Sequence, residues 1–314
     1  MSIIHIKTDV NTSFHNEPES FQGLKKLDES QLQELLEFLV QRNQENYLPL
    51  YLVCFIDLIG QKDKLGNVQQ TVENGSIFRA IQKQQEILRT IDKFRTFFVD
   101  HINKLRESKQ EILELFPLLD NTQRLEYLYP VHSEIFSDSI MIYTQVARAD
   151  NLLLTNFEMI LITCVHAMLE FFSEGIFFRG GISLGRGMRI LTGNLYAYPV
   201  YEACELEESK AKSFRIVVPA QRLHEIDFDS IIQNSVYNNF RILKKDENDP
   251  SIYVLDTFGE ASKTLLEKYS PGYFEQKCLK ILKIADQKIQ EFQNNPQIQQ
   301  KYIELKNTVQ ARSK

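Results

Sequence analysis

Two aspartates stand alone at the ends of apolar segments and could bind a divalent cation together. Asp57 follows the apolar run Tyr51-Leu-Val-Cys-Phe-Ile and precedes Gly60 by three residues. Asp138 lies between two serines, with β-forming residues on either side. Such runs predict buried strands, and a carboxylate at a strand end lies at the sheet edge, where metals and ligands bind. Taken alone, Asp57 could equally cap the following helix.

A pair of carboxylates far apart in sequence suits a pair of divalent cations such as Mg²⁺. Mg²⁺ prefers oxygen ligands and usually takes one or two carboxylates, with phosphates and water completing its shell. Two such ions can activate an attacking hydroxyl and neutralise a leaving pyrophosphate. Backbone amides at Ile59, Gly60 and Gln61, in the turn after the strand, could contact phosphates. The sequence contains no Walker lysine pattern, no GxGxxG after a strand and no GxSxG elbow.

The composition is that of a soluble globular protein. Of the 314 residues, 43% are hydrophobic and 25% charged, which allows one large domain with extensions or two modest ones. The formal net charge of -6 argues against general nucleic-acid binding. We find neither a signal-peptide pattern nor an apolar run of about 20 residues that could span a bilayer, so we expect a cytoplasmic protein. The cysteines lack zinc-ligand spacing and predict reduced thiols: Cys54, Cys164, Cys204 and Cys278.

Hydrophobic periodicity predicts the elements that position the two aspartates. The pattern over residues 76–116 is helical and predicts either two helices with a break near His101 or a projecting, coiled-coil-like arm. Before Ser137 we expect an amphipathic helix after Asp28 or Ser30, a polar loop over 61–75 and a helix or connection over 117–130. Strands are expected on both sides of Ser137-Asp138-Ser139, followed by a helix over 151–174 and by a strand with a glycine pair over 176–184 that leads into a glycine-rich turn. The rest of the chain predicts a helix over 200–212, a strand over 214–219, a hairpin over 237–258 and helices to the end.

This order predicts an α/β (α+β) fold, a mixed sheet flanked by helices. We expect three parts: an N-terminal extension with one amphipathic helix over residues 1–47, a catalytic domain over 48–220, and a peripheral hairpin with helices over 221–314. The last helix carries a thin apolar stripe of Tyr302, Leu305 and Val309, which is typical of a solvated or dimer-packing helix.

Four motifs in this order resemble the catalytic domain of class III nucleotidyl cyclases, over about residues 48–220. They are the strand Phe55-Ile-Asp57-Leu-Ile-Gly60, the turn Phe136-Ser-Asp138-Ser, the strand Arg179-Gly-Gly-Ile-Ser-Leu-Gly185, and Gly193-Asn-Leu followed by the helix Pro199-Val-Tyr201-Glu-Ala203-Cys-Glu205-Leu-Glu207. The serine-flanked aspartate, the Ala-x-x-Leu-Glu helix and the strand Arg215-Ile-Val-Val most resemble the pyrimidine cyclases of bacterial anti-phage (Pycsar) systems.

The resemblance implies that Asp57 and Asp138 bind two Mg²⁺ or Mn²⁺ ions, with the Leu58 carbonyl as a further ligand. It implies conversion of a pyrimidine nucleoside triphosphate, UTP or CTP, to its 3′,5′-cyclic monophosphate with release of pyrophosphate. Members of the family act as dimers with active sites at the interface, so a homodimer is implied. The anti-phage role further implies a separate effector that responds to the cyclic nucleotide.

The sequence departs from the purine cyclases on the helix that carries their transition-state arginine. Tyr201 and Glu205 stand where those enzymes have an asparagine and that arginine. A glutamate cannot stabilise a pentavalent phosphate, so we name Arg179, Arg186 and Arg189 as candidates for this role.

A second departure concerns the base. The lysine that helps to read a purine near the second aspartate is missing, because the preceding residues are Glu134-Ile-Phe-Ser137. This favours a pyrimidine. Tyr196, Tyr198 or Tyr201 could stack on the base, and each could equally be a packing residue.

Two other classes of function stay open. The missing arginine favours a cyclase-like domain that binds a nucleotide or a partner protein without catalysis. A helical scaffold that self-associates through its long helices is a third possibility, but it leaves Asp57 and Asp138 unexplained.

Overall fold

The structure is a computed structural model that describes most of the chain after residue 49. The described ranges are residues 50–107, 131–146, 150–189, 195–225, 241–268 and 270–312. The amphipathic helix predicted after Asp28 or Ser30, the connection over 117–130 and the Gly193-Asn pair lie outside these residues.

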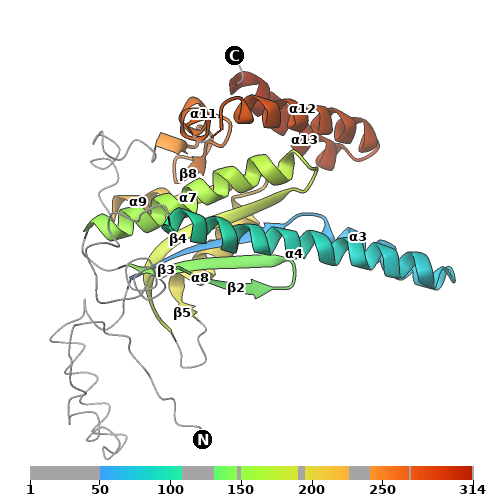
Figure 1. The fold of residues 1–314 in the computed structure, drawn as a ribbon, viewed down its shortest axis with the longest axis horizontal. Helices are drawn as coiled ribbons and strands as arrows, with labels where there is room; N and C mark the ends of the chain where they lie inside the picture. Colours follow the sequence, from blue (N-terminus) through green and yellow to red (C-terminus); the bar gives the residue numbers. More distant parts are fainter. Residues whose placement is uncertain are drawn as a thin grey trace, which may run out of the picture.

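A mixed eight-stranded sheet forms the centre of the molecule (Figure 1), with strand order β2-β3-β1-β4-β6-β8-β7 and with β5 paired to β4. β4 and β6 run parallel, whereas the other described pairs are antiparallel. The predicted fold class, a mixed α/β sheet flanked by helices, is therefore confirmed. The strands are β1 (Leu50–Leu58), β2 (Val131–Phe136), β3 (Ser139–Val146), β4 (Phe178–Arg189), β5 (Leu195–Ala197), β6 (Ile216–Pro219), β7 (Leu243–Lys245) and β8 (Ile252–Leu255).

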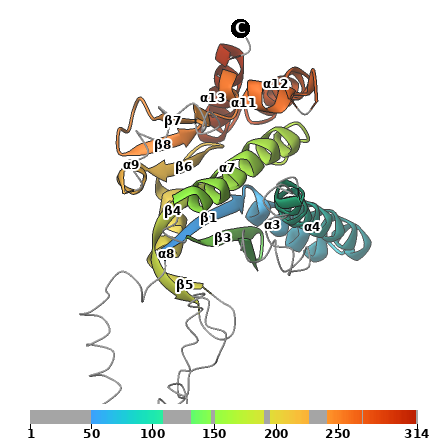
Figure 2. The same ribbon diagram turned by 60° about the vertical axis from the view of Figure 1, so that its left-hand side comes forward.

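Helices cover both faces of the sheet (Figures 1 and 2). α4 (Ile77–Glu107) and α7 (Asp150–Phe172) bury one face, and α8 (Tyr198–Ser209) lies on the other. None of the helices in the described ranges is both long and apolar enough to cross a membrane. The remaining helices are α3 (Gln61–Glu73), α9 (Ala220–His224), α11 (Glu260–Glu267), α12 (Tyr273–Glu291) and α13 (Pro296–Arg312).

β1 is buried on both faces, as its apolar run predicted. Cys54 and Ile56 join the core under α7, whereas Tyr51 and Val53 belong to a second cluster under α8. Because side chains alternate along a strand, Asp57 projects toward the α8 side.

The larger core gathers aromatic rings around the start of β4. The Phe178 ring lies 5.2 Å from that of Phe94 in α4 and 5.3 Å from that of Phe172 in α7. The Phe177 ring lies 5.2 Å from that of Tyr302 in α13. Tyr302 is buried in this core together with the other two residues of its stripe, Leu305 and Val309. The prediction of a solvated or dimer-packing last helix is therefore wrong, because the stripe packs within the chain.

Three further local predictions are corrected. The predicted polar loop over 61–75 contains α3, whose many good helix formers are supported by packing against α4. The predicted turn after the glycine pair is absent, because β4 continues through Gly185 and Gly187. A Cβ at Gly187 would lie 2.0 Å from that of Ala197, so this glycine permits the close approach of β5. α4 is one unbroken helix of 31 residues, which excludes the predicted break near His101.

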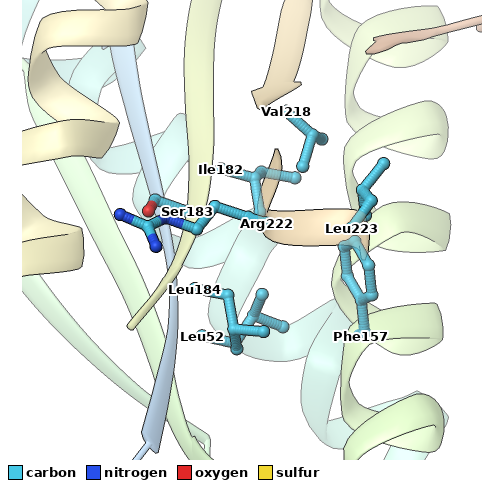
Figure 3. A pocket seen from close by; sticks show the side chains of 8 residues that line it. All are labelled: Leu52, Phe157, Ile182, Ser183, Leu184, Val218, Arg222 and Leu223. Atoms are coloured by element: carbon cyan, nitrogen blue, oxygen red, sulfur yellow. The ribbon is translucent and has the colours of Figure 1, made fainter. Parts of the chain in front are cut away.

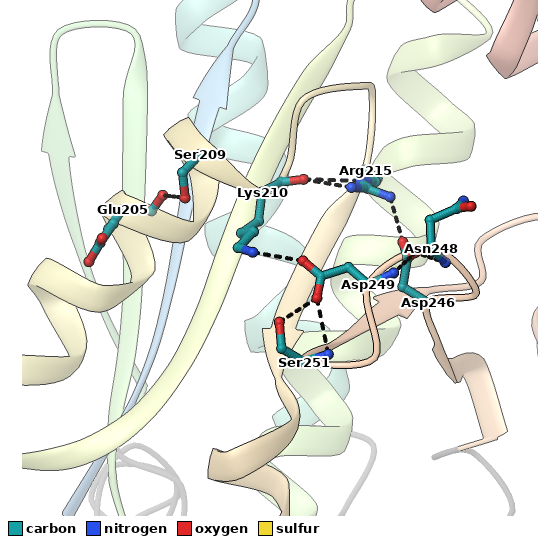
Figure 4. A network of polar contacts seen from close by, with 8 residues as sticks. All are labelled: Glu205, Ser209, Lys210, Arg215, Asp246, Asn248, Asp249 and Ser251. Carbon is teal, nitrogen blue, oxygen red and sulfur yellow. Dashed lines mark hydrogen bonds and ion pairs between the residues drawn. The ribbon is translucent and has the colours of Figure 1, made fainter.

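The predicted hairpin lies at the edge of the main sheet, since β8 pairs with β6, and it also holds the end of α8 (Figure 4). Arg215 donates from Nη1 to Asp246 (2.6 Å) and from Nη2 to the Lys210 carbonyl (2.7 Å). Lys210 itself pairs with Asp249 at 2.7 Å. This network ties the helix to the β7–β8 turn.

Gly181 lets α8 lie directly on β4. A Cβ at this position would lie 2.2 Å from the Ala203 carbonyl oxygen. We expect Gly181→Ala to lower the free energy of unfolding by about 2 kcal/mol, because the helix must move to admit the methyl group. Gly66→Ala is the control, since nothing lies within 4 Å of that added Cβ in α3 and alanine favours helices. Urea unfolding of both variants checks this, and equal midpoints for Gly181→Ala and wild type would contradict it.

A pair of half-buried histidines lies between α4 and α7. His101 Nε2 lies 3.4 Å from His166 Nδ1, and the His166 ring also packs on Tyr273. Burial is the main cause that lowers the pKa of both histidines to about 4, and nearby positive charge contributes to this value. That charge comes from His166 and Lys104 at His101, and from Lys277 and Lys104 at His166.

This shift predicts a loss of stability in acid. Below pH 6.5 the histidines of the unfolded chain take up protons, whereas those of the folded protein stay neutral until about pH 4. Stability should therefore fall between these values, by about 1.4 kcal/mol per pH unit for each histidine. The two histidines together contribute to the slope of the free energy of unfolding against pH, and His166→Gln should remove about half of their contribution. Denaturant titrations at several pH values measure it, and an unchanged slope would refute the assignment.

Candidate active site

Asp57 lies in a row of polar side chains that crosses three strands. The strand register pairs Asp57 with Ser139 of β3 on one side and with Arg179 of β4 on the other. The Ser139 hydroxyl donates a hydrogen bond of 2.6 Å to Asp57 Oδ1. All three side chains face α8, because their neighbours in each strand fill the core under α7.

The charge of Asp57 is disfavoured in the folded protein. Burial raises the pKa of the Asp57 carboxyl above its ordinary value, and the negative charge of Asp138 raises it further. The Ser139 hydrogen bond and the positive charge of Arg179 lower the pKa but do not offset burial. Carboxylates in this condition often occur at functional sites.

Asp138 lies half-buried in the turn between β2 and β3. Its backbone carbonyl accepts a hydrogen bond of 3.4 Å from the Leu58 amide. The preceding residue, Ser137, has a φ of 46°, in the left-handed region. Because β1 and β3 are antiparallel neighbours, the end of β1 meets this turn, and the structure brings the two predicted aspartates together.

The two carboxylates fit a divalent ion that shares its ligands with a substrate. In the described parts of the chain, no group of three or more His, Cys, Asp or Glu side chains is arranged to hold a metal. An ion bound by Asp57 and Asp138 therefore needs phosphate and water oxygens, as Mg²⁺ commonly does. A cation here would also relieve the repulsion between the two carboxylates that raises the pKa of Asp57.

Arg179 is held by a buried glutamate that the sequence motifs contained but did not single out. The Arg179 guanidinium forms an ion pair with Glu207 of α8, a residue only 7% exposed. Burial raises the pKa of Glu207, Arg179 lowers it, and the charge of Asp57 raises it. Glu207 therefore belongs to the same electrostatic cluster as Asp57. Its position at the end of the Ala-x-x-Leu-Glu segment was the only signal.

The turn after β1 differs in one respect from the phosphate-binding turn expected there. The Ile59 amide donates a 2.9 Å hydrogen bond to the Phe177 carbonyl, so this amide is used within the sheet. The sheet ladder extends one residue further than expected and uses that donor. Gly60 has a φ of 84° and is the N-cap residue of α3. The roles of the Leu58 carbonyl and of the amides of Gly60 and Gln61 stay predictions.

The other candidate residues lie away from Asp57 within one chain. Tyr201 is 64% exposed, and its ring contacts that of Tyr198 near the start of α8. It precedes Glu207 by six residues, about 9 Å along the helix axis. Arg186 lies opposite Leu50 at the far end of β1, about 23 Å along β4 from Arg179. The backbone of Arg189 lies further along the same strand, so these two arginines cannot serve Asp57 in the same chain.

A small recess elsewhere in the fold has the wrong chemistry for a nucleotide. It is lined by eight mostly apolar residues around β4, α7 and α9 (Figure 3). Leu52, one of these residues, precedes Asp57 by five positions, about 17 Å along β1. The two polar residues that line the recess, Ser183 and Arg222, are both bound to Glu202, with Arg222 at 2.8 Å. This recess is therefore separate from the aspartates.

Comparison with known proteins found a distant structural similarity. No protein-family model matches the chain, and no curated protein sequence matches it. Among solved structures, the adenylyl cyclase CyaB from P. aeruginosa is similar with 12% sequence identity and a TM-score of 0.35. The similarity covers 66% of this chain and 93% of that chain.

The disfavoured charge of Asp57 predicts that its removal stabilises the protein without metal. Asp57→Asn keeps the acceptor for Ser139 but removes the buried charge, so its Tm in EDTA should exceed that of wild type by a few degrees. Mn²⁺ should raise the Tm of wild type and leave that of Asp57→Asn unchanged. Differential scanning calorimetry measures both effects, with exposed Asp100→Asn as the control. A lower Tm for Asp57→Asn in EDTA would contradict the prediction.

Proposed function

We propose that the protein is a metal-dependent nucleotidyl cyclase whose site is built around Asp57 and Asp138. The observation that carries the proposal is the meeting of these two carboxylates beside Ser139 and Arg179, with the pKa of Asp57 raised by burial and by Asp138. A purely structural role does not explain why two carboxylates that repel each other lie close together. A binding site for a cation and a polyphosphate explains it, because the cation would offset both charges.

The residues of the chain have separable roles in this proposal. Asp57 and Asp138 would hold two Mg²⁺ or Mn²⁺ ions, and Ser139 orients the Asp57 carboxylate through its 2.6 Å hydrogen bond. Such ions, when bound, would offset the charge of a triphosphate and favour ionisation of a ribose hydroxyl. Arg179 lies next to the aspartates and would offset further charge on the phosphates.

The reaction joins the ribose 3′-oxygen to the α-phosphorus of the nucleoside triphosphate. The bond between the α-phosphorus and the bridging oxygen breaks, pyrophosphate leaves, and the 3′-hydroxyl loses its proton. Positioning of the hydroxyl in line with the leaving group would supply much of the rate.

The proposal includes a homodimer with sites completed by a second copy. Within one chain, Arg179 is paired with Glu207, and Arg186 lies about 23 Å along the strand from Arg179. A second arginine, in the transition-state role, is therefore proposed to come from the partner. Tyr196, Tyr198 and Tyr201 are all more than half exposed around the start of α8 and offer aromatic surface for a base or for the second copy.

The substrate is proposed to be UTP or CTP. Tyr201 and Glu205 replace the asparagine and arginine of purine cyclases, and the four residues just before Asp138, Glu134-Ile-Phe-Ser137, contain no lysine. The resemblance to Pycsar cyclases supports a role for the product as a second messenger in anti-phage defence, read by a separate effector.

A second candidate function is favoured by the Arg179–Glu207 ion pair. If this pair stays closed when a nucleotide binds, the chain would bind metal and nucleotide without cyclising it. This candidate predicts binding without turnover at any protein concentration.

Incubation of the purified protein with each of the four nucleoside triphosphates and Mn²⁺ should yield cyclic UMP or cyclic CMP and an equal amount of pyrophosphate. Asp57→Ala and Asp138→Ala should each lower the rate by about a hundredfold or more, because the ligands that position the reactants are lost. Chromatography of the products and a pyrophosphate assay measure this at several protein concentrations.

Asp100→Ala, an exposed aspartate on α4, is the matched control and should keep wild-type activity. Cyclic AMP or cyclic GMP as the main product would refute the pyrimidine assignment alone. Binding of nucleotide with no cyclic product from any of the four would refute the cyclase and favour the second candidate.

A further inference from the structure

Helices α3 and α4 form a helical arm beside the sheet that connects the strand of Asp57 to the turn of Asp138. α3 begins at Gln61, four residues after Asp57, and α4 returns along α3 toward the sheet (Figure 1). About five turns into α4, the Arg95 guanidinium donates from Nη2 to the backbone carbonyl of Ser137. The arm therefore continues from the strand of Asp57 and contacts the turn of Asp138.

The turn that Arg95 contacts has an unfavourable backbone conformation. Ser137 is the one non-glycine residue with a positive φ in the described parts of the chain. A left-handed non-glycine residue costs about 1–2 kcal/mol and persists only where its surroundings impose it. The Leu58 amide holds the Asp138 carbonyl on one side of this residue, and Arg95 holds the Ser137 carbonyl itself.

α4 is rigidly anchored where Arg95 projects from it. Phe94 and Phe98 are fully buried, and the Phe94 ring lies 5.3 Å from Phe171 and 5.2 Å from Phe178. The Arg95 Nε atom is buried without a hydrogen-bond partner among the described residues, and none of the ion pairs found there includes Arg95. Its contact with Ser137 is therefore not a by-product of pairing with a carboxylate.

We propose that Arg95 is a positioning residue for the metal site: it holds the Ser137 carbonyl so that the Asp138 carboxylate stays beside Asp57. Arg95 touches neither the proposed metal nor the substrate. It fixes the turn against a helix that is itself packed on the core, so the two carboxylates are pre-organised before any cation binds. This inference rests on the metal-binding part of the proposed function and does not need turnover.

The test is equilibrium binding of Mn²⁺ to the nucleotide-free protein, measured by titration calorimetry. Arg95→Met removes the donors and keeps most of the side-chain length, and it should weaken Mn²⁺ binding by about tenfold, as expected for loss of one charged hydrogen bond. Arg95→Lys keeps a charged donor and should restore part of the affinity. Arg89→Met makes the same change at an exposed position of α4 and should bind as wild type does.

A kinetic measurement distinguishes loss of positioning from a general loss of catalytic activity. With substrate saturating, Arg95→Met should raise the Mn²⁺ concentration needed for half-maximal rate, whereas kcat at saturating Mn²⁺ should change by less than about threefold. A fall in kcat at unchanged Mn²⁺ dependence would overturn the inference. If Arg95→Met does not fold, Arg95→Lys carries the test, and wild-type Mn²⁺ affinity in that variant would overturn the inference.

The outcomes for the inference and for the proposed function differ. Weakened Mn²⁺ binding in Arg95→Met, with Arg89→Met unaffected, supports the inference even if no cyclic nucleotide is formed by wild type. Wild-type Mn²⁺ affinity in Arg95→Met overturns the inference even if wild type is an active cyclase. Absence of Mn²⁺ binding by wild type, or binding that Asp138→Ala leaves intact, overturns the inference and the metal site together.

Discussion

The candidate site depends on the burial of alternate residues in β1. Ile56 and Leu58 are almost fully buried in the core under α7, so Asp57 between them must face α8. A shift of one residue would exchange the two faces of the strand and bury the carboxylate in an aromatic core. That arrangement would cost several kcal/mol, because a buried charge without a partner is poorly solvated. Hydrophobic burial on one face therefore sets the register that delivers Ser139 and Arg179 to both sides of Asp57.

The surroundings of the site disfavour the negative charges of its carboxylates. Burial raises the pKa of both Asp57 and Glu207. The negative charge of Asp138 raises the pKa of Asp57 further, and the negative charge of Asp57 raises that of Glu207. Arg179 lies within the influence of both and lowers both pKa values. The ion pair between Arg179 and Glu207 attaches α8 to β4 close to Gly181, where any side chain would collide with the helix. Packing of the helix and the charge of the site are therefore linked, as expected where function is favoured over stability.

The helices outside the sheet do more than cover it. α13 completes the aromatic core around Phe177, next to the strand that carries Arg179, and the β7–β8 turn holds the end of α8 through Arg215. α4 supplies Phe94 to the core and Arg95 to the turn of Asp138. Segments far from the four motifs thus determine how rigidly the motif residues are held. This rigidity matters because catalytic geometry tolerates little displacement.

The sequence by itself determined the fold class, the buried strand that ends at Asp57, the serine-flanked turn of Asp138 and the strand that carries the glycine pair. These follow from local patterns: apolar runs, short polar turns and glycines each restrict the backbone directly. The sequence did not determine that residues 61–73 form a helix, that the stripe of Tyr302 packs inward, or that Arg95 and Glu207 hold the turn and Arg179. Each of these rests on contacts between segments distant in the chain. Only the tertiary structure decided them, because local composition carries no information about which distant surface will bury a stripe or satisfy a charge.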